Sequence, residues 1–144
     1  MYPLFIAAAL AISLAIAFTS QIARQAEDSE RATVQEIASN AAIYLGRAKS
    51  YVRSNPTYSG PLDAGAMSLP SWFAKLDGLQ GYAEQGKGYV FLTGYSAQQA
   101  VDAGDLMQTS YARGVKVAGV VHSPTGDVFN PPTQIPDGAY VIRF

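Results

Sequence analysis

The stretch that decides the fold is residues 1–54, MYPLFIAAALAISLAIAFTSQIARQAEDSERATVQEIASNAAIYLGRAKSYVRS. No proline occurs between Pro3 and Pro56, and the only glycine in the stretch is Gly46. Proline is tolerated in the first turn of a helix, whereas it disfavours the α region for the residue before it, so Asn55-Pro56 is a stop signal. The sequence predicts one helix here, roughly 80 Å long at about 1.5 Å per residue.

The two parts of this predicted helix differ in polarity. Residues 1–20 carry no charged side chain, and such a run matches the roughly 30 Å hydrocarbon core of a bilayer. We interpret residues 1–20 as a transmembrane half. Residues 21–54 form the amphipathic and polar half, and residues 55–144 remain as an α+β head.

A secretory signal peptide is the competing interpretation of the apolar start. Ala15-Ile16-Ala17 has the small-x-small pattern of a cleavage site. No basic region precedes Leu4, however, and the helical pattern continues through Phe18 without a turn residue. The sequence favours an uncleaved anchor, with a cleaved periplasmic protein as the alternative.

An apolar seam begins in the second half of the helix. Its members recur at spacings of three and four, which places them on one helix face that needs a cover. We expect this face to pack on the chain's own C-terminal sheet, and the alternative is a coiled-coil or bundle partner. The seam consists of Val34, Ile37, Ala41, Tyr44, Ala48 and Tyr51.

The head reads as a small sheet with one helix. Residues 55–71 are rich in proline and glycine and predict a loop, and residues 71–79 predict a short helical turn with Trp72 and Phe73 filling the core. Ser96 and Gln99 form a capping-box pattern that predicts the start of a helix. The three predicted strands, rich in aromatic and β-branched residues, are 87–95, 113–121 and 138–144.

These elements predict an α+β fold in which the long N-terminal helix, with its membrane half and its amphipathic half, packs on a small, mostly antiparallel sheet. We expect three or four strands, with the seamed part of the helix covering one face. This arrangement is pilin-like.

Composition excludes several classes of function. The net charge is -1 and the pI is near 5.7, which argues against nucleic acid, because phosphate binding needs a basic face. Basic residues of the head are scattered rather than clustered. The chain has no cysteine, so disulfides, iron–sulfur clusters and thiolate zinc sites are excluded.

No arrangement typical of catalysis occurs in the sequence. The only histidine, His122, is next to Ser123 and close to Asp127, but three residues of one turn rarely converge as a nucleophilic triad must. The acidic residues lack calcium-loop spacing. Gly86-x-Gly88 leads into a strand rather than into the helix N-terminus that would bind a phosphate. We expect no enzyme, no cofactor and no metal site.

An apolar helix that continues as an amphipathic helix against a small sheet resembles the plan of type IV pilins and pseudopilins. The sequence departs from their processing signal, since it has no basic leader ending in glycine and its first acidic residue is Glu27. It is more similar to the PilM family of type IVb pilus systems on conjugative plasmids and related pathogenicity loci, which is unrelated to the actin-like protein of the same name. Length, the apolar start and three motifs carry this resemblance: Leu69-Pro70-Ser71-Trp72, Gly88-Tyr89-Val90-Phe91 and Ile135-Pro136-Asp137-Gly138-Ala139.

The resemblance implies a single-pass inner-membrane protein of pilus biogenesis, with its head in the periplasm. The charge rule by itself gives no orientation, because Arg24 and Arg31 alternate with Glu27, Asp28 and Glu30. The expected function is non-enzymatic, through contacts with other pilus assembly proteins or pilins, or with a second copy. The alternative is a pilin-like structural subunit of a filament. The family supplies no catalytic or binding residues.

Overall fold

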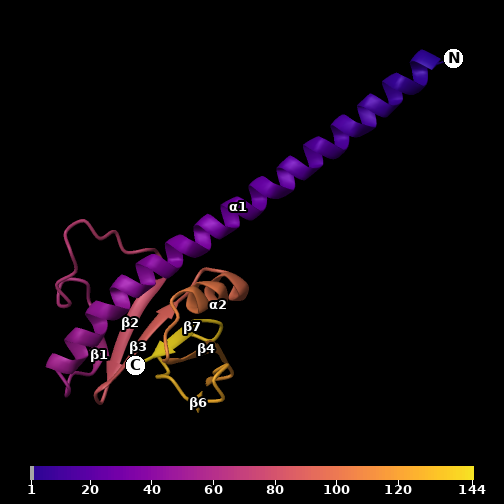
Figure 1. Ribbon diagram of the computed structural model, residues 1–144. Helices are drawn as coiled ribbons and strands as arrows, with labels where there is room; N and C mark the ends of the chain where they lie inside the picture. The colour runs from indigo at the N-terminus through magenta and orange to yellow at the C-terminus, as the bar shows by residue number, and fades with distance from the viewer. Residues whose placement is uncertain (1) are drawn as a thin grey trace. The chain divides into compact units, whose positions relative to one another are not determined.

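The computed structural model describes the backbone of residues 2–144 and the side chains of residue 21 and residues 23–144. The chain divides into two compact units, one up to Thr33 and one covering Val34–Phe144. Figure 1 shows the elements in order: α1 Tyr2–Ser54, β1 Gly60–Pro61, β2 Leu79–Glu84, β3 Lys87–Leu92, α2 Ala97–Leu106, β4 Ala112–Val117, β5 Val120–His122, β6 Val128–Phe129 and β7 Tyr140–Arg143.

The first unit consists of helix α1 up to Thr33. From Ala23 to Ala32 every side chain is exposed, as the polar sequence of this segment predicts. The expected transmembrane half, residues 1–20, lies outside the residues whose side chains are described. Among the residues that are described, no helix is both long enough and apolar enough to cross a membrane.

The second unit is built on a seven-stranded antiparallel sheet in the order β1-β2-β3-β7-β4-β5-β6. The last strand, β7, lies in the middle, where Val90 of β3 faces Ile142 and Gly114 of β4 faces Val141. The two-residue strands β1 and β6 form the edges. The predicted α+β class, with a long N-terminal helix on an antiparallel sheet, is confirmed, although the sheet has more strands than expected.

Helix α1 covers one face of the sheet from Val34 onward. Strand side chains alternate between the two faces, and Val90 and Leu92 of β3 join the buried cluster beneath this helix. Helix α2 closes the same cluster with Ala100 and Ala103. It begins with the predicted capping box, since the Ser96 hydroxyl accepts from the Gln99 N–H and the Gln99 side chain accepts from the Ser96 N–H.

The opposite face carries a second, smaller buried cluster. Tyr89 and Phe91 of β3 point into it, together with Ile135 from the loop between β6 and β7. Lys116 of β4 fastens this loop: its ammonium donates to the carbonyl of Ile135 at 2.6 Å and to that of Pro132 at 3.4 Å. The Lys116 side chain is only 6% exposed, so the loop and the lysine cover each other.

Several local predictions were wrong. Residues 71–78 consist of turns and irregular backbone without a helix, and Leu79 already begins β2. Trp72, expected in the core, is 72% exposed. The predicted strand 113–121 is a hairpin, because Ala118 and Gly119, both at positive φ, make the tight turn that two-residue hairpin loops require. Neither strand β2 nor strand β6 was predicted.

Candidate functional site

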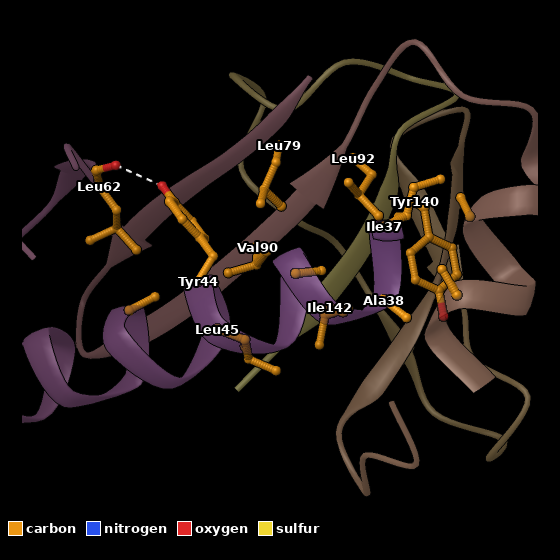
Figure 2. Close-up of a cluster of buried hydrophobic side chains, with 14 of the residues drawn as sticks. Ile37, Ala38, Tyr44, Leu45, Leu62, Leu79, Val90, Leu92, Tyr140 and Ile142 are labelled. Carbon is orange, nitrogen blue, oxygen red and sulfur yellow. Dashed lines mark hydrogen bonds between the residues drawn. The ribbon is translucent and has the colours of Figure 1, made fainter. Parts of the chain in front are cut away.

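The helix face singled out in the sequence belongs to the core of the second unit. Five of its six members are 6% exposed or less, and Tyr51 is half-buried, with its ring edge-on to Tyr58 at 5.3 Å. Figure 2 shows this face over Leu79, Val90 and Ile142 of the sheet. The buried members are Val34, Ile37, Ala41, Tyr44 and Ala48.

Tyr44 links this face to the loop that precedes β2. Its hydroxyl donates to the carbonyl of Leu62 at 2.8 Å, the dashed line in Figure 2. Burial, together with the charge of Asp63, raises the pKa of Tyr44 to about 12. Because the five seam side chains from Val34 to Ala48 are buried within the chain's own core, they are not accessible to a partner protein. A contact with another protein would use a different surface.

The most exposed large apolar side chain of the described residues is Trp72, at 72%. Its ring lies edge-on to that of Phe73, with 6.4 Å between ring centroids. Phe73 is half-buried and packs against the main core, so Phe73 anchors the segment and leaves the indole in solvent. Tryptophan is the residue type most enriched among the energetic anchors of protein–protein interfaces.

Asn40 of α1 holds this segment in place. Its side-chain amide donates to the carbonyl of Ala74 at 2.7 Å, and its side-chain oxygen accepts from the N–H of Leu76 at 3.2 Å. One asparagine thus satisfies a donor and an acceptor of a loop without regular structure. We call residues 70–76 the Trp72 loop. A preorganised loop presenting a large ring loses little conformational entropy on binding, so it is our candidate interaction site.

Two hollows flank α1 elsewhere on the second unit. One, of about 270 Å³, lies between α1 and the end of α2, where Ala38 and Ala42 face Leu106 and Met107. Leu106 is 52% exposed. The other, also about 270 Å³, lies beside the last turns of α1 and is lined by Lys49, Val52, Arg53, Gly86, Tyr111 and Phe144.

The residues considered for catalysis form an ordinary turn. The Ser123 hydroxyl accepts from the N–H groups of Arg113 and Thr125, and the Thr125 hydroxyl donates to Asp127. His122 is exposed, and none of the hydrogen bonds in this turn involves its ring. Among the described residues, no group of three or more potential metal ligands is close enough to hold an ion.

Sequence reasoning misplaced two residues, Trp72 and Lys116. Trp72 was assigned to the core because of its hydrophobicity, although the preceding Leu-Pro-Ser run signals an exposed loop. Lys116 was counted among the scattered basic residues of the head, with no buried role assigned to it. Its alternation with Gly114 and Ala112 in β4 places it on the face of the second cluster, and that alternation was the available signal.

Comparison with known proteins identifies the family. A family model described as PilM matches residues 7–143. The crystal structure of a protein named PilM from Pseudomonas aeruginosa 2192 is 32% identical, covers 76% of this chain and 92% of its own, and has a TM-score of 0.50. That of a protein named PilM from Escherichia coli B7A is 15% identical, covers 79% and 93%, and shares the fold with a TM-score of 0.60. No curated protein matches significantly in sequence. The chain belongs to the PilM family.

Proposed function

We propose that this chain is a membrane-anchored, non-enzymatic component of type IV pilus biogenesis or of a related secretion machine. The observation that carries the proposal is its membership of the PilM family over nearly the whole chain. The uncharged residues 1–20 support a single inner-membrane span. The second unit then lies in the periplasm and acts by contacts with other pilus assembly proteins or pilins.

The Trp72 loop is the surface we assign to these contacts. Its indole is exposed while Phe73 and Asn40 fix the backbone around it. Truncation of such an anchor removes much of the binding energy of an interface. It leaves the core of the free protein intact, because the ring is solvated before binding.

Membrane anchoring is tested on the intact chain. Cell membranes are washed with alkaline carbonate, and spheroplasts are treated with external protease. We expect the chain to stay in the membrane pellet and its second unit to be digested. Release by carbonate refutes the anchor. Mass spectrometry of the mature N-terminus separates the signal-peptide alternative, which requires a chain that begins at Phe18.

The contact function is tested by complementing a deletion strain with Trp72→Ala. We expect fewer pili than with the wild type at equal protein level. Val117→Ala is the matched control, since Val117 is also strongly exposed, at 64%, but lies at the turn between β4 and β5. Full piliation with Trp72→Ala, or equal loss with the control, refutes the assignment of the Trp72 loop.

The second candidate is a pilin-like filament subunit. It is favoured by the continuous helix α1, Tyr2–Ser54, packed on an antiparallel sheet from Val34 onward. A bundle of apolar helices and a bilayer make similar demands on residues 1–20. Sheared, purified filaments distinguish the two functions: high copy number there supports the subunit, whereas presence in envelope fractions alone supports the assembly component.

A further inference from the structure

The hollow beside the last turns of α1 combines two cations with an apolar wall. Lys49 and Arg53 come from α1, Tyr111 directly precedes β4, and Phe144 directly follows β7. The rings of Tyr111 and Phe144 meet edge to face, with 6.3 Å between centroids. Gly86 lies in the turn between β2 and β3 and contributes no side chain to the lining.

Neither Lys49 nor Arg53 forms an ion pair with a carboxylate side chain of the described residues. The ion pairs of the described residues are Arg113 with Asp105 and Lys116 with Asp137. Lys49 instead donates to the Tyr111 hydroxyl, and its ammonium lies 5.1 Å from the centroid of that ring. Arg53 is exposed and has no hydrogen bond among the described side chains. No acidic residue lines the hollow.

The end of α1 sets how an anion would be held. The C-terminal carbonyls of a helix carry partial negative charge, which disfavours a bound anion. Any attraction must therefore come from the side chains of Lys49 and Arg53, both of which line the hollow. Removal of either charge should consequently have a large effect on binding.

The size of the hollow indicates what kind of molecule fits. Its volume of about 270 Å³ is just below the lower end, roughly 300 Å³, of pockets that enclose small organic ligands. One or two amino-acid side chains fit that space. The mixed lining selects a carboxylate next to an apolar or aromatic group, because the cations pair with the first and Val52, Tyr111 and Phe144 contact the second.

We propose that this hollow, the basic–aromatic hollow, binds an acidic segment of a partner protein in which a glutamate or aspartate adjoins an aromatic or aliphatic residue. The inference rests on the proposed function, in that it names the chemistry of one protein contact. It is independent of the Trp72 loop, which lies on a different segment of the chain.

The experiment measures fluorescence anisotropy of a labelled peptide with alternating glutamate and phenylalanine, titrated with the full-length protein in a non-ionic detergent. We expect saturable binding that weakens as salt rises, since exposed charge pairs are screened. The same peptide with glutamine in place of glutamate should bind at least about ten-fold more weakly. Absence of saturable binding, or equal affinity for the glutamine peptide, overturns the proposal.

Matched variants locate the binding. Arg53→Gln and Lys49→Gln should each weaken binding about ten-fold, the loss expected for a charge pair of about 1.4 kcal/mol. Arg47→Gln removes the same charge from an exposed position of α1 outside the hollow and should leave affinity unchanged. Equal losses for all three variants would mean non-specific attraction and overturn the proposal.

Two further controls keep the outcome interpretable. Arg53 is exposed and has no hydrogen bond among the described side chains, so Arg53→Gln should leave the fold intact. It therefore decides the matter even if Lys49→Gln loosens the Tyr111 contact, which the near-ultraviolet circular dichroism of tyrosine would reveal. A negative peptide result refutes the hollow alone, while membrane fractionation and piliation continue to test the proposed function separately.

Discussion

Replacing Lys116 by methionine tests how the second face of the sheet is covered. The substitution keeps a long apolar stem and removes the ammonium that donates to the carbonyls of Ile135 and Pro132. Ile135 is completely buried in the cluster under this loop. Loss of the donors leaves both carbonyls without that partner, so the loop should detach more readily.

The magnitude follows from the two distances. The bond to Ile135, at 2.6 Å, is short and charge-assisted, whereas the one to Pro132, at 3.4 Å, is weak. A hydrogen bond to a charged group is worth about 1.5–3 kcal/mol. We therefore expect Lys116→Met to lower the free energy of unfolding by about 2 kcal/mol. In a unit of this size that lowers Tm by roughly 8 °C.

Urea denaturation followed by far-ultraviolet circular dichroism measures this free energy, with Lys87→Met as control. Lys87 is an exposed lysine at the start of β3, and its replacement should change stability by less than about 0.5 kcal/mol. Amide hydrogen exchange gives a local measure: the N–H groups of Ile135 and Ala139 should exchange faster in Lys116→Met.

One result would refute this reasoning. Buried ions replaced by apolar residues sometimes leave stability unchanged or raise it, because the desolvation cost of the charge disappears. If Lys116→Met is as stable as the wild type and its loop amides exchange no faster, the ammonium does not hold the loop. Packing of Ile135 alone would then account for the cover.

Three further predictions concern the core and the exposed ring. Burial raises the pKa of Tyr44 and of Tyr140 from 10.0 to about 12. Since the unfolded chain loses these protons first, the free energy of unfolding should fall as pH rises from about 10 to 12. This fall should be less steep in Tyr44→Phe than in the wild type, and an equal slope in urea titrations would contradict the prediction. Gly104→Ala should destabilise the protein by about 1–3 kcal/mol, because the new Cβ would lie 1.9 Å from the Tyr140 hydroxyl. Gly46 lies on open helix surface, so Gly46→Ala should stabilise the protein by up to about 1 kcal/mol. Thermal melts of both variants check this contrast. Trp72→Ala should leave Tm unchanged within about 2 °C, because an exposed side chain contributes little to stability, and a larger drop would show that the indole packs.

The long helix and β3 could be predicted because their signals are local. The spacing of apolar residues between Val34 and Tyr51 has helical periodicity, and the aromatic and β-branched run at the start of 87–95 is typical of a strand. The capping box at Ser96 is equally local. Each of these depends on contacts between residues close in sequence, which single-sequence reasoning captures.

Strand β2 could not be predicted because Gly81 within it and Gly78 before it are required by contacts with residues distant in sequence. A Cβ at Gly81 would lie 3.0 Å from Leu62 and 3.1 Å from the Tyr44 ring, so glycine makes room for α1 and the preceding loop. Gly78 has φ +81°, and its added Cβ would collide with the Thr93 carbonyl at 2.0 Å. Only the assembled sheet explains either residue.

The candidate site could not be predicted from the sequence for a similar reason. Whether Trp72 fills the core or faces solvent depends on the backbone clamp from Asn40, which lies more than thirty positions earlier in the chain. The basic–aromatic hollow likewise joins residues from α1, from the turn between β2 and β3, and from the ends of the neighbouring strands β4 and β7. No short sequence pattern predicts that residues so distant in the chain lie together.

The central position of β7 also bears on when this protein can fold during synthesis. The strands made before it form two separate groups, β1-β2-β3 and β4-β5-β6, which have no ladder to each other until Tyr140–Arg143 enters between them. A nascent chain whose β7 is still inside the ribosome tunnel therefore has two unpaired sheet edges, those of β3 and β4. The emergence of β7, rather than of any earlier strand, closes the sheet. A chain truncated before Tyr140 would expose two unpaired edges for chaperones and proteases to recognise.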